Sequence, residues 1–487
     1  MRYTEIAVAT PYKGAPKINA AGCIGASPKK PILIKIPVTG ERPITYGACG
    51  LPEGLSLSGD IITGSVGREG SYTFTLTAEN ALGKDEKCVT LEIKQDTVLL
   101  TPLMGFTSWN AFGFEVTQKN LEDTAMKMKE LGLTEYGYGY INIDSGWQGE
   151  YGGKFDAIMP NEKFPDMKGF CDRMHALGFK CGIYSTPMLY AFGTSINYRP
   201  LPPGCTQGEA DDRFSEEHFG IGKIRKEGNN ALQWADWGFD YLKYDWRPSD
   251  PVNAELMRRE LVSTDRDFGF CVSVKARAEY HKYWEKYCNS YRCNIDSMGT
   301  WTNLLTIYRT YFDFIEYVNR GHYFDLDMLD LGECDLFYKL DFVSAPDFGF
   351  SEDEALVVYS MRAFLNSPIQ ISCHLEKLSD FEISMYCNEE IIAINQDTAF
   401  STAKPHMLIE DGKKIVHVFK KKLEGGDIAY AVFNLGETKE NVKVFLDDPS
   451  YVRDVWAKKD MGEASVLSLP EMPMHTVRIF RTTPKSK

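Results

Sequence analysis

The chain has 487 residues, of which 43% are hydrophobic and 13% aromatic, and its formal net charge at pH 7 is -14. This length exceeds that of one ordinary core, so we expect two or three domains of globular composition. Nucleic acid and anionic membranes bind basic surfaces, so an acidic chain excludes both as expected partners, and no apolar run reaches the ~18 residues of a membrane span.

The first residues lack the long apolar stretch of a secretory signal. The 12 cysteines are scattered, without a CxxC pair or a Cys/His cluster at metal-ligand spacing. We therefore expect a cytoplasmic protein with reduced thiols and no structural zinc.

Residues 1–97 are predicted to form a β module. Short alternating runs such as "SYTFTLTAEN" and "CVTLEIKQ" are separated by turns such as "SLSGD" and "GREG", which is an antiparallel pattern. The stretch "GLPEGLSLSGDIITGSVGREGSYTFTLTAENALGK" resembles the immunoglobulin-like modules found beside bacterial carbohydrate enzymes. The resemblance implies a β-sandwich.

Residues 98–401 alternate short apolar strands with helical segments, which predicts βα units and a parallel sheet. Eight strands are expected, in "PLMGFTSW", "YGYINID", "KCGIYST", "FDYLKYD", "GFCVSVKA", "SYRCNID", "GHYFDLDM" and "SPIQISC". "TQKNLEDTAMKMKELGL" and "MKGFCDRMHALGF" are two of the helices. Eight such units predict an α/β fold of the (β/α)8 TIM-barrel type.

Residues 402–487 return to short strands, in "KKIVHVFKKKL", "DIAYAVFNLG", "NVKVFLDD" and "HTVRIFRTT". They predict a C-terminal antiparallel β-sandwich domain packed on the barrel.

Charged residues gather at the ends of the predicted barrel strands, where barrel active sites form. Lys243 and Asp245 are two residues apart in "YLKYD" and therefore point to the same side of a strand. Strands two, six and seven carry acids in the same way, at Asp144, at Asp296, and at Asp325 and Asp327. Buried ion pairs that only stabilise the barrel are the structural alternative, but four such strands with nearby aromatic residues favour a polar site for a sugar.

Two acids can cleave a glycosidic bond, one by attacking the anomeric carbon and the other by protonating the leaving oxygen. Lys243 is expected to lower the pKa of Asp245 and keep it ionised as a nucleophile. The second acid needs a raised pKa, which burial or a neighbouring negative charge could supply.

The barrel sequence resembles glycoside hydrolase family 27, the family of retaining α-galactosidases and α-N-acetylgalactosaminidases. The matching stretches, in family order, are "TPLMGFTSWNAFG", "YGYINIDSGWQG", "KFPDMKGFCDRMHALGFKCGIYST", "WADWGFDYLKYDW", "YRCNIDSMGTW", "DLDMLDLG" and "EEIIAINQD", and "VRDVWAKKDMGE" resembles the family's C-terminal domain. The resemblance implies that Asp245 is the nucleophile and Asp296 the acid/base. It implies that the sugar is held by Trp109, Asp144, Tyr184, Lys243, Arg292 and Asp327.

Three features depart from the family pattern. Ser145 stands where a second Asp usually binds the C4 and C6 region of galactose. In "SVKARAEY", where the family reads the C2 substituent, an extended strand would place Lys275 on one face with Arg277 and Glu279. Lys275 then either pairs with the pocket acids or contacts an acidic substituent of the sugar. The segment 187–228 is long for a βα loop and is either a lid or a surface excursion.

The predicted function is a retaining α-glycosidase for galactose-configured sugars, with a glycoside as its partner and no metal or organic cofactor. An N-acetylated, pentose or otherwise modified sugar is the alternative glycone. Other classes are a carbohydrate-binding protein without catalysis and a metal-dependent barrel that uses Asp325 and Asp327 as ligands. A homo-oligomer is left open.

Overall fold

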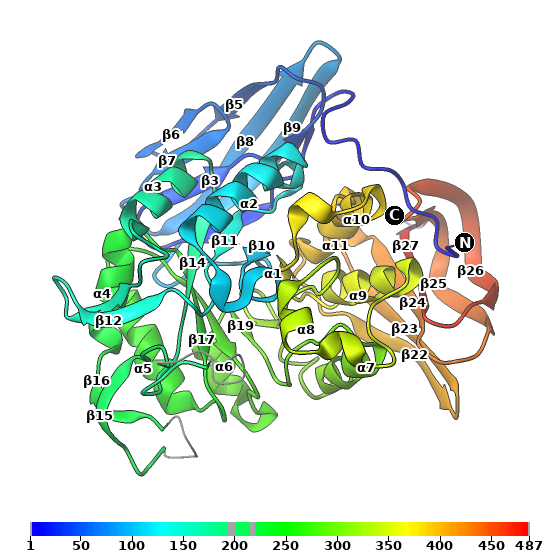
Figure 1. Ribbon diagram of the computed structural model, residues 1–487. Coiled ribbons are helices and arrows are strands. Elements are labelled where there is room, and N and C mark those ends of the chain that lie inside the picture. Colours follow the sequence, from blue (N-terminus) through cyan, green and yellow to red (C-terminus); the bar gives the residue numbers. More distant parts are fainter. Residues whose placement is uncertain (1, 193–200, 215–219, 486–487) are drawn as a thin grey trace.

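The computed structural model describes residues 2–192, 201–214 and 220–485. Along the chain these residues form an N-terminal β module, an α/β barrel and a C-terminal antiparallel sheet (Figure 1). Among the described helices, none is long and apolar enough to cross a membrane. The 12 cysteines are free thiols.

The eight predicted barrel strands are all present and form one parallel sheet in the order β20-β19-β18-β17-β14-β11-β10-β21. A single parallel bridge between Leu329 and Ile371 joins the segment after β20 to β21. The (β/α)8 prediction is therefore confirmed. The strands are β10 (Met104–Thr107), β11 (Tyr140–Asn142), β14 (Lys180–Ser185), β17 (Tyr241–Asp245), β18 (Gly269–Ser273), β19 (Ser290–Tyr291), β20 (Tyr323–Phe324) and β21 (Ile369–Ile371).

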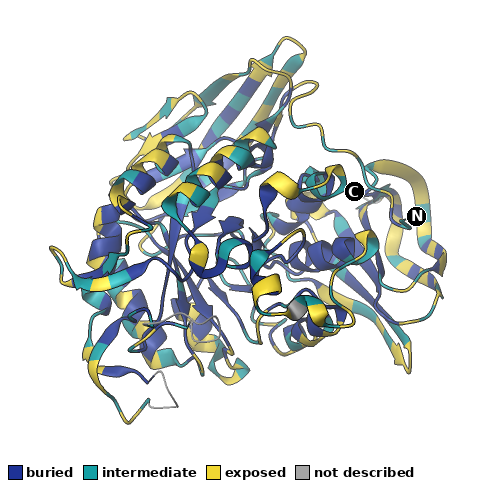
Figure 2. Ribbon diagram, in the orientation of Figure 1, coloured by how far each residue is buried: buried dark blue, intermediate teal, exposed yellow. Residues whose placement is uncertain are grey.

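Helices surround the strands and leave them buried on both faces, as Figure 2 shows by colour. All five residues of β18, for example, are buried, as expected for a strand enclosed by a parallel barrel. The α-helices are α1 (Trp109–Phe112), α2 (Gln118–Glu130), α3 (Met167–Ala176), α4 (Glu227–Trp237), α5 (Pro251–Val262), α6 (His281–Tyr287), α7 (Trp301–Thr310), α8 (Asp335–Lys339), α9 (Glu352–Phe364), α10 (Asp380–Tyr386) and α11 (Glu389–Asn395). Two antiparallel strand pairs, β12 (Gln148–Gly152) with β13 (Ala157–Pro160) and β15 (Thr206–Ala210) with β16 (Gly222–Arg225), lie in the loops between barrel strands.

The N-terminal module contains two main sheets, in the orders β2-β9-β8-β5 and β3-β7-β6, and the short pair β1-β4. Its strands are β1 (Lys17–Ile18), β2 (Cys23–Ala26), β3 (Ile32–Lys35), β4 (Val38–Thr39), β5 (Thr45–Cys49), β6 (Leu55–Ser58), β7 (Ile61–Gly64), β8 (Gly70–Asn80) and β9 (Gly83–Ile93). The module contacts the barrel where its strands begin: Asp96 pairs with Arg258, and the Ser27 N–H donates to Asp267 Oδ2 at 2.6 Å, just before β18. The opposite end of the barrel is left for the site.

The first residues of the chain lie away from this module, in contrast to the predicted 1–97 unit. The Thr4 hydroxyl donates to Val477 O at 2.7 Å, and the Ala7 N–H donates to Trp456 O at 2.9 Å. Figure 1 accordingly shows the N-terminus beside the C-terminal strands. This segment ties the start of the chain to its end.

The C-terminal part is a six-stranded antiparallel sheet in the order β22-β23-β24-β27-β25-β26. Its strands are β22 (Lys404–Asp411), β23 (Lys414–Lys422), β24 (Ile428–Asn434), β25 (Glu440–Asp454), β26 (Lys459–Met472) and β27 (Thr476–Pro484). The Trp456 indole is buried against the barrel and donates to Ser360 Oγ of α9 at 3.1 Å. The sequence pattern did not predict β22 and β26.

Candidate active site

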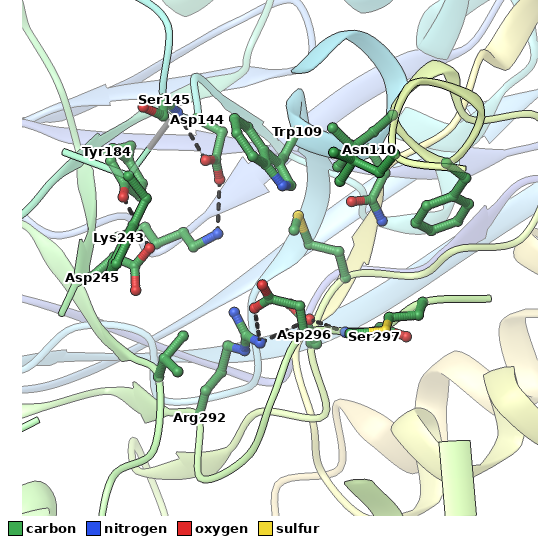
Figure 3. A pocket seen from close by; sticks show the side chains of 18 of the residues that line it. Trp109, Asn110, Asp144, Ser145, Tyr184, Lys243, Asp245, Arg292, Asp296 and Ser297 are labelled. Atoms are coloured by element: carbon green, nitrogen blue, oxygen red, sulfur yellow. Dashed lines mark hydrogen bonds and ion pairs between the residues drawn. The ribbon is translucent and has the colours of Figure 1, made fainter. Parts of the chain in front are cut away.

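A cavity of about 260 Å³ opens at the C-terminal ends of the barrel strands. Figure 3 shows Asp144, Lys243 and Asp245 on one wall and Arg292 and Asp296 on another. The cavity is lined by Trp109, Asn110, Asp144, Ser145, Tyr184, Phe192, Lys243, Asp245, Arg247, Val274, Arg292, Asp296, Ser297, Met298, Asp327, Met328, Leu336, Phe337 and Leu340. All the predicted site residues except Lys275 are in this set.

Lys243 and Asp245 both face the cavity from β17, as their spacing predicted. The Lys243 ammonium donates to Asp144 Oδ2, at the end of β11, at 2.8 Å. Burial opposes the charge of Lys243, but Asp144 and Asp245 outweigh it and raise its pKa. Lys243 is therefore a fixed positive charge in the cavity.

Asp245 is 8% exposed and is held by one hydrogen bond, in which the Tyr184 hydroxyl donates to Asp245 Oδ2 at 2.9 Å. Asp245 Oδ1 has no hydrogen-bond partner among the described residues. Burial raises the pKa of Asp245 to about 7, although Lys243 acts in the opposite direction, and the negative charge of Asp296 adds to the rise. The prediction that Lys243 keeps this pKa low was wrong, because its ammonium is bonded to Asp144 and cannot offset the loss of water.

Asp296 lies at the cavity mouth, with a side chain that is 65% exposed. Arg292 Nη2 contacts Asp296 Oδ1 at 2.7 Å and Asp327 Oδ2 at 2.9 Å, and its Nη1 donates to Ser273 Oγ at 3.0 Å. The surrounding cavity walls partly desolvate the Asp296 carboxyl group, which favours its neutral form, but the charge of Arg292 outweighs this effect and lowers the pKa of Asp296. The raised pKa expected for the second acid is thus on Asp245 instead.

Trp109 and Ser145 complete the predicted sugar contacts. Trp109 begins α1 and packs edge-on against Phe114, with 5.0 Å between the ring centroids. The Ser145 N–H donates to Asp144 Oδ1 at 2.8 Å, while its buried hydroxyl has no partner within the described chain.

Lys275 does not reach the cavity, and the predicted strand through "SVKARAEY" was wrong. β18 ends at Ser273, and the next two residues have positive φ angles, 135° at Val274 and 57° at Lys275. Lys275 is exposed, and Arg277 and Glu279 form an exposed pair with each other at 3.5 Å. The side chain that lines the cavity here is Val274.

The sixth strand is also shorter than predicted, since β19 ends at Tyr291. Asn294, expected on the same face as Arg292 and Asp296, instead donates its amide to Thr306 O of α7 at 3.1 Å. The chain after Tyr291 therefore leaves the sheet before it reaches Asp296.

Several lining residues were not predicted. Asn110 and Met328 are direct neighbours of predicted residues, so the same motifs could have indicated them. Leu336, Phe337 and Leu340 come from α8 and the residue that follows it, in a segment without a chemical motif. Only the tertiary fold brings this apolar wall to the site.

The 187–228 segment is described in part, since residues 193–200 and 215–219 lie outside the described residues. Its strands β15 and β16 are described and pair antiparallel. Phe192 lines the cavity, and the Arg247 guanidinium lies 5.4 Å from its ring centroid. Whether the segment acts as a lid stays a prediction. Across the described residues, no group of three or more His, Cys, Asp or Glu side chains is placed to hold a metal ion.

Comparison with known proteins gives matches to three families along the chain. Residues 15–94 match the family described as "Putative Ig domain", residues 219–397 match Alpha galactosidase A, and residues 413–482 match Alpha galactosidase C-terminal beta sandwich domain. These ranges correspond to the module, part of the barrel and the C-terminal sheet.

Individual relatives match most of the chain. Alpha-galactosidase A of Cellvibrio japonicus (strain Ueda107) is 27% identical over 426 residues, which are 80% of this chain and 94% of that protein. The crystal structure of a "putative alpha-galactosidase/melibiase" from Bacteroides fragilis NCTC 9343 is 30% identical with a TM-score of 0.81, and the match covers 97% of this chain and 99% of that one. A "putative alpha-galactosidase" of the same organism is 28% identical with a TM-score of 0.80, covering 98% and 99%. With its barrel, its strand-end carboxylates and these relatives, the chain belongs to glycoside hydrolase family 27, the α-galactosidase family.

Proposed function

We propose that this enzyme hydrolyses terminal α-linked, galactose-configured sugars with retention, through a covalent ester on Asp245. The observation that carries the proposal is that Asp245, at the end of β17, and Asp296, in the loop after β19, face one small cavity, each within the field of a buried cation. Two carboxyl groups flanking one sugar are the requirement of the double-displacement mechanism.

In the first step, a carboxylate oxygen of Asp245 bonds to the anomeric carbon while the bond to the aglycone oxygen breaks. Asp296 gives its proton to that oxygen, and the aglycone leaves as an alcohol. In the second step, a water molecule bonds to the anomeric carbon as the ester bond to Asp245 breaks, and the Asp296 carboxylate takes the water's proton. Tyr184 supports both steps, because its hydroxyl orients Asp245 through Oδ2.

Other groups of the cavity suit the hydroxyls of a neutral sugar. Asp144 and Lys243 form one hydrogen-bonding pair, and Arg292 and Asp327 form another. Trp109 offers an aromatic surface for the C–H face of the ring. Because Lys275 lies outside the cavity, the hypothesis of an acidic substituent on the sugar loses its basis.

The two carboxyl groups predict an unusual pH dependence, because they titrate as a pair. The reactive state for an ordinary glycoside has one proton on the pair, placed on Asp296. Since the pKa of Asp245 is raised to about 7 and that of Asp296 is lowered, the pair carries one proton between the lowered pKa of Asp296 and about pH 7, and none at higher pH. We expect kcat/KM for an alkyl α-galactoside to fall as pH rises through about 7.

A dinitrophenyl glycoside needs no proton on its leaving oxygen, only an ionised Asp245, so its kcat/KM should rise through the same pH. In Asp296→Asn the negative charge that raises the pKa of Asp245 is lost, and this rise should move to lower pH. Parallel pH profiles for the two substrates would count against the assignment. The measurement is kcat/KM from pH 4 to 9 for both substrates and both proteins.

A pentose glycone is the second candidate, favoured by Ser145. β-L-Arabinopyranose has the ring configuration of α-D-galactopyranose without the C6 hydroxymethyl group. An enzyme that has one hydrogen-bond acceptor fewer near C6 gains less binding energy from that group, so it discriminates less against the pentose. Rates of the native enzyme on aryl α-D-galactopyranoside and aryl β-L-arabinopyranoside test the proposal. Faster hydrolysis of the pentoside would favour the second candidate, and hydrolysis of neither would reject both.

Ser145→Asp should shift this preference toward galactose. The added carboxylate supplies an acceptor for a sugar hydroxyl, and a hydrogen bond to a charged group is worth enough for roughly a 10-fold gain in the galactoside-to-pentoside ratio of kcat/KM. Ser145→Asn is the matched control, with an amide of equal size and no charge. An unchanged ratio in Ser145→Asp would show that this position does not read C6.

A further inference from the structure

The segment that follows Asp296 makes an unusual set of hydrogen bonds. Asp296 has left the sheet and stands at the cavity mouth, 65% exposed. A group so exposed, beyond the end of its strand, is not held in place by packing alone. The three residues after it, Ser297 to Gly299, nevertheless donate each of their backbone N–H groups to a side chain from another part of the barrel.

Asp330 holds two points of this segment with one carboxylate oxygen. Its Oδ2 accepts a hydrogen bond from Ser297 Oγ at 2.6 Å and another from the Gly299 N–H at 2.6 Å. Asp330 is 6% exposed and lies in the segment after β20. Burial raises the pKa of Asp330, and the buried Arg362 guanidinium opposes the rise. The Asp330 side chain therefore holds the chain at both Ser297 and Gly299.

Asn303, on the first turn of α7, brackets the same segment from the other side. Its Nδ2 donates to the carbonyl oxygen of Asp296 at 3.1 Å, and its Oδ1 accepts from the Met298 N–H at 3.0 Å. Both of its amide functions are therefore spent on the backbone around Asp296. Ser297 lies between the two residues that Asn303 binds, and its N–H donates to Asp327 Oδ2 at 2.7 Å.

We propose that Asp330 and Asn303 are positioning residues for Asp296: they clamp residues 296–299 so that the Asp296 carboxyl group meets the leaving oxygen. The inference rests on the proposed function, since it assigns the residues to the proton-transfer step. Neither residue lines the cavity. A displacement of about 1 Å in a catalytic group can lower the rate 10²-fold, so a loosened clamp has a large effect.

Asp330→Ala removes the anchor, and Asp330→Asn is the conservative variant, because its amide oxygen can accept both hydrogen bonds. We expect kcat/KM of Asp330→Ala to fall about 10²-fold on an alkyl α-galactoside and less than about 3-fold on a dinitrophenyl galactoside, which needs no proton. Asp330→Asn should restore most of the loss. Asn303→Ala, which removes the other half of the clamp, should show the same dependence on the leaving group.

Asn388→Ala is the control for a general loss of stability. Asn388 is a buried residue before α11 that also binds backbone groups on both sides. It accepts hydrogen bonds from the N–H groups of Glu390 and Ile391 and donates to Val455 O at 3.3 Å. Its removal should lower both substrates' rates by the same factor, if at all. Equal losses on both substrates in Asp330→Ala and Asn303→Ala, or no loss, would overturn the proposal.

Hydrogen exchange tests the clamp without any activity. In Asp330→Ala, the amides of residues 297–299 should exchange at least about 10-fold faster than in the native enzyme, and in Asn388→Ala they should not. If Asp330→Ala does not fold, Asn303→Ala is measured in its place. Unchanged exchange overturns the clamp. If the native enzyme hydrolyses none of the glycosides, the proposed function and the role in proton transfer fail together, whereas exchange still decides whether the clamp exists.

Discussion

Asp245→Asn is expected to lower kcat by at least about 10⁴-fold on every substrate, activated or not, because no ester can form without the nucleophile. Binding of galactose should persist, since Tyr184 and the Asp144–Lys243 pair remain. Turnover under substrate saturation, with calorimetry for sugar binding, measures both effects. A mutant within ~10-fold of native kcat would show that Asp245 is not the nucleophile.

The thermal stability of Asp245→Asn serves as its folding control. The pKa of Asp245 is raised in the folded protein above its unfolded value of about 4, so this carboxyl group lowers the stability of the fold progressively from about pH 4 to about pH 7, and by a constant amount above pH 7. The neutral amide of Asn does not ionise, so it removes this loss of folding stability. We therefore expect the Tm at pH 8 to stay the same or to rise.

Asp325→Asn is the matched substitution. Asp325 is also a buried carboxyl group with a pKa raised to about 6, by burial and by Asp327, but it does not line the cavity. Its Oδ1 accepts from the Asp327 N–H at 2.9 Å, and an amide oxygen can keep that bond. Its activity loss should be far smaller than that of Asp245→Asn, which separates the loss of a nucleophile from the loss of a buried charge.

Asp296→Asn is expected to produce the second largest effect, and only on poor leaving groups. General acid catalysis contributes about 10²–10⁴-fold, so alkyl galactosides should lose that factor, while dinitrophenyl galactoside should form the glycosyl-enzyme at nearly the native rate. A leaving-group series of kcat/KM values measures the difference. Equal losses across the series would contradict the acid role.

The second step gives an internal control for Asp296→Asn. Without the base, water attacks the ester slowly, and added azide, which needs no base, should accelerate turnover of the activated substrate. The product should be the α-glycosyl azide, because two inversions restore the configuration. If azide does not accelerate turnover, Asp296 is not the base of the hydrolysis step.

The barrel could be predicted from the sequence because each strand is a short apolar run between helical segments. Such a run results when a strand is buried on both faces. Strand ends were less predictable. "SVKARAEY" alternates like a strand, yet the positive φ angles at Val274 and Lys275 turn the chain out of the sheet. Valine and lysine rarely adopt a positive φ, so the sequence gives no sign of this turn.

The site residues at strand ends were predictable because the barrel brings those ends together. The pKa order of the two acids was not. It depends on how deeply Asp245 is buried and on Lys243 bonding to Asp144, a residue 99 positions away. Asp330 was missed for the same reason, since its contact with Ser297 spans 33 positions.

The most direct test of the account is to trap the covalent intermediate. A fluorinated galactosyl substrate with a good leaving group forms the ester faster than the ester is hydrolysed, so intact-mass spectrometry should show one added glycosyl unit. Fragmentation of the peptide that contains β17 should place the unit on Asp245. Steady turnover without any labelled enzyme, or a label on another residue, would contradict retention through Asp245.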